Sequence, residues 1–439
     1  MNNVQVFEGN RLDTKPPDFS SKKERCRFLG RDSLGAACTV PLSDELLSSH
    51  LLFLGGIGTG KTNAIFQLLA QLRSSMTDRD VMLVFDTKGD FHKEFYRPGD
   101  TVISNDAKAT GPDGVDYWNI FGEIGTGESV EANIVEIAKT LFHERTEKTS
   151  QPFFPNAAKD LFGGILTHFA RARDGATMDN ARLRSFLDQA TAGELRSLLQ
   201  SHADMKAMVS YIADDRSPQT QGVLSELQQM VREILIGNFR KPGAISVRDS
   251  IRRKGGRCIF VEYDLGIGGL LTPIYRLLLD LAIKESLCRE KSDGNVWFVI
   301  DEFRLLPSLQ HADNGVNFGR SLGAKFIIGA QNIDQVFHGY GESLARSILS
   351  GFMTTVSFRV NDANTREFVK GLFGKNRKRE TYMAAIQTRG ISETVREANV
   401  VEDWDTANLA TGQAILSMPG YMPFLFQFDQ HKPTPSATV

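Results

Sequence analysis

Near the start of the chain stands Gly55-Gly56-Ile57-Gly58-Thr59-Gly60-Lys61-Thr62, a glycine-rich stretch that directly follows the apolar residues 51–54. The apolar run predicts a β-strand, and the helical spacing of apolar residues over 62–72 predicts a helix. A glycine-rich loop between a strand and a helix presents backbone N–H groups at the helix N-terminus, where they bind phosphate. In this pattern the lysine ammonium reaches the outer phosphates, and the threonine hydroxyl binds Mg²⁺. The sequence therefore predicts a nucleotide-binding loop (P-loop, Walker A) that comprises Gly55, Gly56, Ile57, Gly58, Thr59, Gly60, Lys61, Thr62 and Asn63.

A second motif consists of the five apolar residues Val296–Ile300 followed by Asp301 and Glu302. An apolar run of this length is typical of a buried central strand. Such a strand delivers Asp301 to Mg²⁺, and Glu302 can activate the attacking water as a general base. By itself the pattern is equally typical of two carboxylates that cap a following helix. Its combination with the P-loop favours a Walker B motif, with Asp301 and Thr62 as metal ligands and Lys61 and Glu302 as catalytic residues.

The remaining periodicity predicts an α/β fold with a mainly parallel sheet flanked by helices. Strands are expected at 51–55, 81–86, 101–104, 257–263, 296–301, 325–329, 354–360, 413–417 and 423–428. Strand patterns are absent between about 152 and 240, where apolar residues recur at helical spacing. An all-α domain is therefore expected between the two Walker motifs. The predicted units are a flexible arm (1–27), the nucleotide-binding domain in two parts (28–150 and 241–432), the all-α insertion (151–240) and a disordered tail (433–439).

Composition excludes several classes of protein. The chain has 439 residues, of which 41% are hydrophobic, and a net charge of -2, so it is neither fibrous nor intrinsically disordered. A basic surface for nucleic acid, if there is one, must be local. The cysteines at 26, 38, 258 and 288 form no metal or disulfide pattern. No run of 18 apolar residues occurs. We therefore expect a cytoplasmic protein.

Ligands bind at the carboxyl ends of parallel strands, and this rule lets us place two further candidate site residues. Gln331 lies just beyond the strand 325–329, so we expect it beside the nucleotide as a sensor of the γ-phosphate or water. Arg320 ends a helix before that strand begins, about 15–20 Å from the phosphates of its own chain. It can serve only a neighbouring subunit, as an arginine finger in trans, unless it simply complements the helix dipole.

The nucleotide is expected to be ATP. Thr87-Lys88-Gly89-Asp90 resembles the guanine-reading box of G proteins, but it lies directly after the strand 81–86 and precedes the Walker B carboxylates. Asp86 and Lys88 either line the nucleotide site or form a solvated turn.

A basic loop is predicted after Gly374, with Lys375, Arg377, Lys378 and Arg379. Such a loop is either a contact for the DNA backbone or an ordinary solvated surface. A second basic cluster, Arg252-Arg253-Lys254 with Arg257, has the same two interpretations.

Several of these stretches together resemble the ATPases of the type IV secretion coupling protein family, the TraD/TrwB-like branch of the FtsK–HerA superfamily. The resemblance covers nearly the whole chain and includes the all-α domain between the Walker motifs. It rests on residues 50–55, 85–91, 118–120, 154–158, 300–303, 319–320, 329–332 and 409–413.

The resemblance implies a RecA-like hexameric motor that hydrolyses ATP with Mg²⁺ to move DNA during conjugation. It also implies that Lys61 and Thr62 are the Walker A pair, Asp301 and Glu302 the Walker B pair, Arg320 the trans arginine finger and Gln331 the sensor. The implied partners are DNA, further copies of the chain, a relaxase or relaxosome, and secretion-machinery proteins. Family members usually begin with transmembrane helices, so a peripheral place at the inner membrane through partners is a further expectation. A HerA-like DNA pump and a non-translocating ATPase that docks protein substrates are the alternatives.

Overall fold

The computed structural model describes residues 3–19, 23–106, 116–172, 178–288, 294–383 and 391–433. Its centre is a sheet in the order β3-β2-β14-β13-β10-β4-β9-β8-β5-β7-β6. The parallel part of this sheet comprises β10 (Thr354–Ser357), β4 (Leu51–Leu54), β9 (Ala324–Ala330), β8 (Val296–Ile300), β5 (Val81–Asp86), β7 (Arg257–Glu262) and β6 (Thr101–Ile103). The antiparallel part comprises β13 (Gln413–Ser417), β14 (Phe424–Phe428), β2 (Cys26–Arg31) and β3 (Ala37–Leu42).

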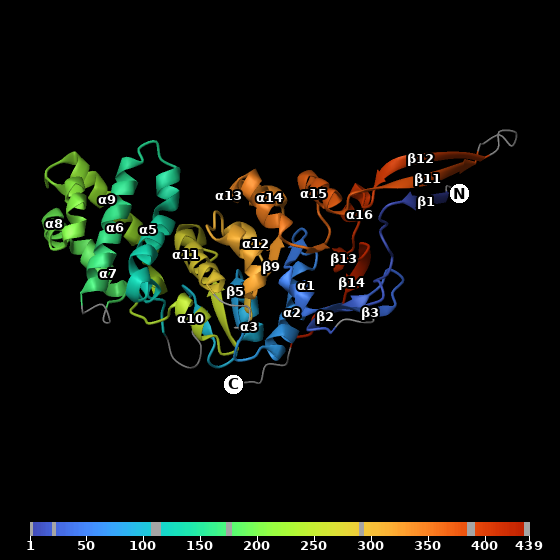
Figure 1. Cartoon of the computed structure of the whole chain (residues 1–439), viewed down its shortest axis with the longest axis horizontal. Helices are drawn as coiled ribbons and strands as arrows, with labels where there is room; N and C mark the ends of the chain where they lie inside the picture. Colours follow the sequence, from blue (N-terminus) through green and yellow to red (C-terminus); the bar gives the residue numbers. More distant parts are fainter. Residues whose placement is uncertain are drawn as a thin grey trace.

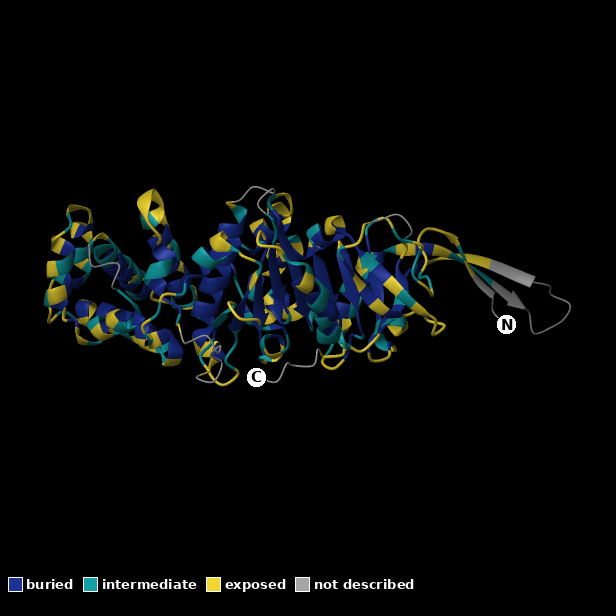
Figure 2. Ribbon diagram, turned by 90° about the horizontal axis from the view of Figure 1, so that it is seen from below, coloured by how far each residue is buried: buried dark blue, intermediate teal, exposed yellow. Residues whose placement is uncertain are grey.

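Helices cover both faces of this sheet, so its central strands are buried from end to end (Figure 2). Leu52 and Leu54 of β4 point into one core, and Leu51 and Phe53 point into the other. One face is covered by α1 (Asp44–Ser48), α2 (Lys61–Ser75) and α3 (Asp90–Phe95). The other is covered by α11 (Gly268–Leu287), α12 (Ala312–Leu322), α13 (Ile333–Tyr340) and α14 (Glu342–Ser350). The predicted α/β fold is confirmed, and each run predicted as a strand contains one, although the run 354–360 is a strand only over Thr354–Ser357.

A block of helices lies at one end of the elongated molecule, between β6 and β7 in the chain (Figure 1). Its elements are α4 (Ile120–Ile124), α5 (Val130–Glu147), α6 (Phe153–Arg171), α7 (Asn180–Gln189), α8 (Ala192–Gln200), α9 (Pro218–Ile234) and α10 (Val247–Arg253), with a 3₁₀ segment at Ala203–Ile212. The predicted insertion, 151–240, falls within this block. The block itself begins earlier, with α4 and α5, and ends later, with α10.

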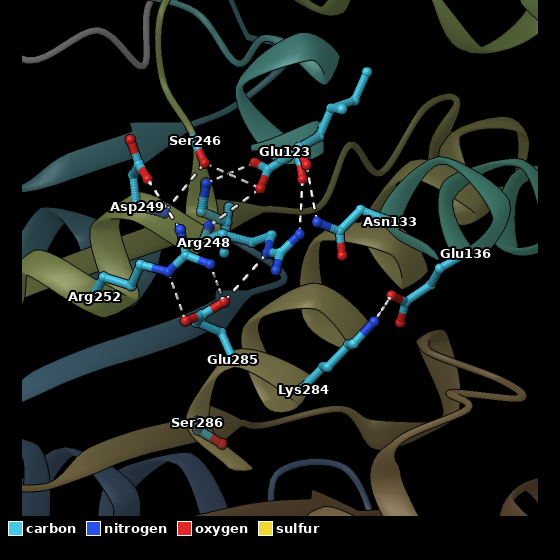
Figure 3. Close-up of polar contacts among 12 residues, drawn as sticks. Glu123, Asn133, Glu136, Ser246, Arg248, Asp249, Arg252, Lys284, Glu285 and Ser286 are labelled. Atoms are coloured by element: carbon cyan, nitrogen blue, oxygen red, sulfur yellow. Dashed lines mark hydrogen bonds and ion pairs between the residues drawn. The ribbon is translucent and has the colours of Figure 1, made fainter. Parts of the chain in front are cut away.

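The block is joined to the sheet by a buried polar network (Figure 3). The Glu123 carboxylate on α4 is fully buried and accepts hydrogen bonds from Trp118 Nε1 (2.9 Å), the backbone N–H of Val247 (2.7 Å) and the hydroxyl of Ser246 (3.1 Å). Arg248 on α10 then pairs with Glu285 on α11 at 3.2 Å. Because each buried polar group has a partner, the network fixes α4 and α10 against α11.

A second, small sheet at the opposite end corrects two predictions (Figure 1). It consists of β1 (Asn3–Glu8), β11 (Lys375–Met383) and β12 (Ile391–Asn399). The predicted flexible arm therefore contains a strand, β1, and the predicted basic loop at 375–379 is itself a strand. The strand β1 was missed because it pairs with a strand some 370 positions away, which leaves no local pattern. Of the predicted tail, 433–439, all but residue 433 lies outside the described residues.

The remaining α-helices of the described residues are α15 (Ala363–Phe373) and α16 (Asp403–Ala407), which precede β11 and follow β12 in the chain. Among the described residues, no helix has the length and apolar character that crossing a bilayer requires.

Candidate nucleotide-binding and hydrolysis site

The P-loop connects the end of β4 to the first residue of α2, Lys61. Gly55 and Gly60 have φ angles of +155° and +114°. A Cβ on Gly55 would lie 2.6 Å from Phe358 Cβ, and one on Gly60 would lie 3.0 Å from Gly412 Cα. Glycine is required at both positions, because the backbone is left-handed there and neighbouring segments approach closely.

Lys61 lies beneath the loop and is 7% exposed. Its ammonium donates to the backbone oxygens of Gly55 (2.5 Å) and Gly56 (3.2 Å). Burial lowers the pKa of Lys61, against the opposing effect of the nearby carboxylates of Asp301 and Glu302. The charge is thus held at the N-terminus of α2, where the helix dipole also favours an anion.

Thr62 and Asp301 meet although they belong to different strand–loop units. The Thr62 hydroxyl donates to Asp301 Oδ2 at 2.8 Å, while Asp301 Oδ1 is buried without a hydrogen-bond partner. Burial raises the pKa of Asp301, and the Thr62 hydrogen bond opposes that shift. A hydroxyl oxygen beside a carboxylate oxygen that lacks a partner is the donor set that Mg²⁺ binds. The residues present therefore fit the ion that the sequence predicts.

Glu302 and Gln331 are also brought together. β9 lies between β4 and β8, so Gln331, just past the end of β9, stands between the P-loop and the Walker B strand. Its side-chain amide donates to Glu302 Oε2, and Arg304 Nε donates to Glu302 Oε1 at 3.1 Å. Burial raises the pKa of Glu302, which brings the carboxylate closer to the range of an effective general base.

Arg320 lies at the opposite edge of the sheet. It is an exposed residue in the last turn of α12, and β9 begins four residues later. The seven residues of β9 span about 23 Å at 3.3 Å per residue, and Gln331 lies at the far end. Within one chain Arg320 is thus remote from the P-loop, as the sequence predicted. Its role in trans stays a prediction.

The side chain of Asn63 contacts the backbone of the C-terminal segment. Its side-chain amide donates to the backbone oxygen of Asp429 (3.0 Å), and its side-chain oxygen accepts from the backbone N–H of His431 (2.7 Å). The side chain therefore holds the C-terminal segment against α2. Ile57, at the tip of the P-loop, is 83% exposed, and Thr59 is buried.

Two residues that buttress the P-loop were not assigned a role from the sequence. The N–H of Gly412 donates to the Thr59 oxygen (2.8 Å), and the Arg359 oxygen accepts from the N–H of Gly56 (2.9 Å). Gly412 belongs to the stretch 409–413 that carried part of the family resemblance, so that stretch was the available signal. Arg359 offered none, because it acts through its backbone.

Asp86 and Lys88 take different positions. Asp86 is buried, and its carboxylate accepts from the backbone N–H groups of Lys88 (3.2 Å), Gly89 (2.9 Å) and His92 (2.9 Å). It therefore builds the turn between β5 and α3. Lys88 is exposed and lines a cleft of 690 Å³ at the carboxyl ends of β5, β6 and β7.

The four basic residues proposed to contact DNA lie on two faces of the small sheet. Alternation along β11 places Lys375, Arg377 and Arg379 on one face and Lys378 on the other. Lys375 pairs with Glu397 (2.7 Å), Arg377 with Glu8 (3.3 Å) and Lys378 with Glu402 (3.9 Å). The Arg379 guanidinium lies 5.0 Å from the centre of the Phe7 ring. These contacts explain how so charged a segment forms a strand.

Fold and site together define a P-loop nucleotide-binding protein with a helical block between its Walker motifs. Residues 35–430 match the family described as the type IV secretion-system coupling protein DNA-binding domain, and the chain belongs to this family. It is 23% identical over 424 residues to the coupling protein TraD of Escherichia coli K12, a match that covers 94% of this chain and 55% of TraD. It is 22% identical over 283 residues to the coupling protein VirD4 of Bartonella henselae, covering 62% of this chain and 44% of VirD4. The chain thus spans about half the length of these relatives.

Solved structures agree on the fold. The plasmid coupling protein TrwB in complex with ADP and Mg²⁺ superposes with a TM-score of 0.74 at 18% identity, over 99% of this chain and 96% of TrwB. VirB4 of Thermoanaerobacter pseudethanolicus superposes with a TM-score of 0.57 at 12% identity, over 94% of this chain and 98% of VirB4.

Proposed function

We propose that this chain binds ATP with Mg²⁺ and hydrolyses it to move DNA, as a coupling protein of a type IV secretion machinery. The observation that carries the proposal is the Thr62–Asp301 contact, in which the second carboxylate oxygen of Asp301 is buried without a hydrogen-bond partner. It is supported by family membership and by the ADP and Mg²⁺ complex of the TrwB relative.

Each side chain has a distinct task in this proposal. The P-loop N–H groups and Lys61 bind the β- and γ-phosphates. Thr62 and Asp301 would hold Mg²⁺, which would supply positive charge beside the phosphates. Glu302 accepts a proton from the attacking water, and Gln331, already bonded to Glu302, orients that water.

The site of one chain is completed by Arg320 of a neighbour in a homo-hexameric ring. The position of Arg320 at the opposite edge of the sheet supports a role in trans, and a trans arginine is a large catalytic contribution in this chemistry. The ring would pass DNA from a relaxosome to the secretion machinery and lie peripherally at the inner membrane through its partners.

The test is ATP hydrolysis by the purified chain without DNA, with single-stranded DNA and with duplex DNA, using Lys61→Ala as the blank. Stimulation by DNA supports the translocase. Turnover that requires Lys61 and is indifferent to both DNAs refutes it and favours an ATPase that docks protein substrates.

A second measurement concerns the small sheet. The face that carries Lys375, Arg377 and Arg379 is the proposed DNA contact, so neutralising these three should weaken binding to any DNA sequence and reduce its salt dependence. Lys378→Ala, on the other face and beside Glu402, is the matched control and should have little effect. Equal effects of the two changes would remove this face from the DNA path.

A further inference from the structure

The helices α5 and α11 pack against each other, and each carries a polar stripe within an otherwise apolar contact. The stripes repeat every four residues, which places their members on one face of each helix. They are Glu136, Thr140 and Glu144 on α5, and Arg276, Asp280 and Lys284 on α11. We call these six side chains the polar seam.

The seam converges on the segment 308–311. Glu136 is its most connected member, because its carboxylate contacts His311 Nε2 (2.6 Å) and accepts from the Lys284 ammonium (Figure 3 shows the pair with Lys284). Thr140 Oγ1 accepts from the Gln310 amide at 3.4 Å.

The α11 side reaches the same segment. Arg276 donates to the backbone oxygen of Ser308 at 3.2 Å and lies 3.7 Å from the carboxylate of Glu144. Asp280 accepts from the backbone N–H of His311 at 3.1 Å. Every member of the seam thus contacts the segment directly or through one other member.

Residues 303–307 connect this segment to Glu302, the proposed general base. Glu302 is hydrogen-bonded to Gln331, and the residues that follow it are firmly held. The Phe303 ring stacks on Tyr340 with centroids 5.1 Å apart, and the Tyr340 hydroxyl donates to the Leu306 oxygen at 2.5 Å. Ser308 adopts a φ of +57°, and its hydroxyl donates to the Gly339 oxygen at 2.8 Å. The residues between Glu302 and His311 are therefore held in one defined arrangement against α13.

A purely structural role does not account for the polar character of the seam. Arg276 and Asp280 are each 1% exposed, and Arg276 Nε and Asp280 Oδ2 have no hydrogen-bond partner. Burying such groups is costly, and apolar side chains of similar volume would pack two helices at least as well. Polar contacts, by contrast, have discrete partners that can be exchanged when a segment moves.

We propose that the polar seam links the nucleotide site to the helical block, with Glu136 as the positioning residue that couples the segment 302–311 to α5. The inference rests on the proposed function only in requiring that the site bind ATP. The link works in both directions, because coupling between two sites is reciprocal. Events at the helical block therefore reach Glu302 through the same contacts.

The experiment measures amide hydrogen exchange in α5 with and without ADPNP, for the wild-type chain, Glu136→Ala and Glu147→Ala. Glu147 is an exposed residue on the same helix outside the seam, so Glu147→Ala is the matched control. We expect ADPNP to change α5 exchange by about fivefold or more in the wild-type chain and in Glu147→Ala. In Glu136→Ala the change should fall below about twofold, with ADPNP affinity within about twofold of wild type.

Three further variants guard against a simple packing defect. His311→Ala removes the other partner of the same contact. The change in α5 exchange on adding ADPNP should therefore be no smaller in the double variant Glu136→Ala/His311→Ala than in either single variant. Glu136→Gln keeps one oxygen acceptor and should retain part of the response. If the two side chains contributed only to packing, the loss of response in the double variant would equal the sum of the losses in the two single variants.

The outcomes separate the two proposals. A wild-type chain that fails to bind ADPNP overturns the proposed function and the link with it. A chain that binds ADPNP without any change in α5, or that responds equally in Glu136→Ala, overturns the link alone. Loss of the response in Glu136→Ala with retained binding supports it.

Discussion

Gly329→Ala should move β9 away from the end of β8, which carries both catalytic carboxylates. Gly329 lies in β9 beside the end of β8, and a Cβ there would stand 2.2 Å from the backbone oxygen of Asp301 and 2.9 Å from its carbonyl carbon. Real Cβ atoms do not approach closer than about 3.0 Å, so the strands must move apart by about 0.8 Å. Overpacking of this kind costs about 1–3 kcal/mol of unfolding free energy.

The same movement displaces Asp301 and Glu302 relative to the P-loop. A misplacement of about 1 Å can lower turnover by about 100-fold, so we expect kcat for ATP to fall by roughly that factor. The assays are urea unfolding, for the midpoint and its slope, and steady-state ATP hydrolysis.

Gly371→Ala is the matched control, because it makes the same chemical change on α15 where a Cβ would meet no atom within 4 Å. Removing a helical glycine should stabilise the chain by about 0.5–1 kcal/mol and leave turnover unchanged. If Gly329→Ala unfolds at the wild-type midpoint with wild-type kcat, then β8 and β9 are not held together as described, and the reasoning fails.

Three further predictions concern the site and its attachment. Lys61→Ala should weaken ATP binding about 10- to 150-fold, because a charged hydrogen-bond donor to phosphate is lost. Glu302→Gln should bind ATP normally and lose about 10²–10⁴-fold in kcat. Nucleotide titration and turnover measurements distinguish the two variants, and an equal loss of ATP binding in both would contradict the assigned roles. Arg320→Ala should lower kcat about 10³–10⁵-fold. Mixing Arg320→Ala chains with inactive Lys61→Ala chains should restore part of the activity, because the intact P-loop of the first then meets the arginine of the second. If no mixing ratio restores activity in confirmed assemblies, a trans role is excluded. Glu123→Ala leaves several buried donors without an acceptor and should lower the unfolding free energy by about 3–5 kcal/mol. A loss below about 1 kcal/mol in urea unfolding would show that this carboxylate does not hold α4 and α10 together.

Much of the site was predictable because its motifs are local. Lys61 and Thr62 are specified by a glycine pattern between a strand and a helix, and the apolar run before Asp301 specifies a buried strand. Gln331 followed from its place two residues past the predicted strand 325–329. By contrast, the contact between Gln331 and Glu302 depends on β9 lying between β4 and β8, and strand order is set by packing across the whole sheet.

The basic run at 375–379 shows the opposite case. Its composition is typical of a loop, yet it forms the middle strand of the small sheet. Glu397 on the adjacent strand β12, Glu402 just after that strand and Glu8 from the start of the chain neutralise its charges. Similarly, nothing in the sequence of α5 or α11 marks their polar residues as partners of the segment after Glu302.

The sequence by itself therefore determined the phosphate-binding chemistry, the α/β class and the presence of a helical block, because each depends on residues close together in the chain. Only the tertiary structure decided which strands are neighbours, where β1 lies and how Glu136 reaches His311. Those arrangements depend on contacts between segments far apart in the sequence, whose free energies are collective and leave no pattern in any one segment.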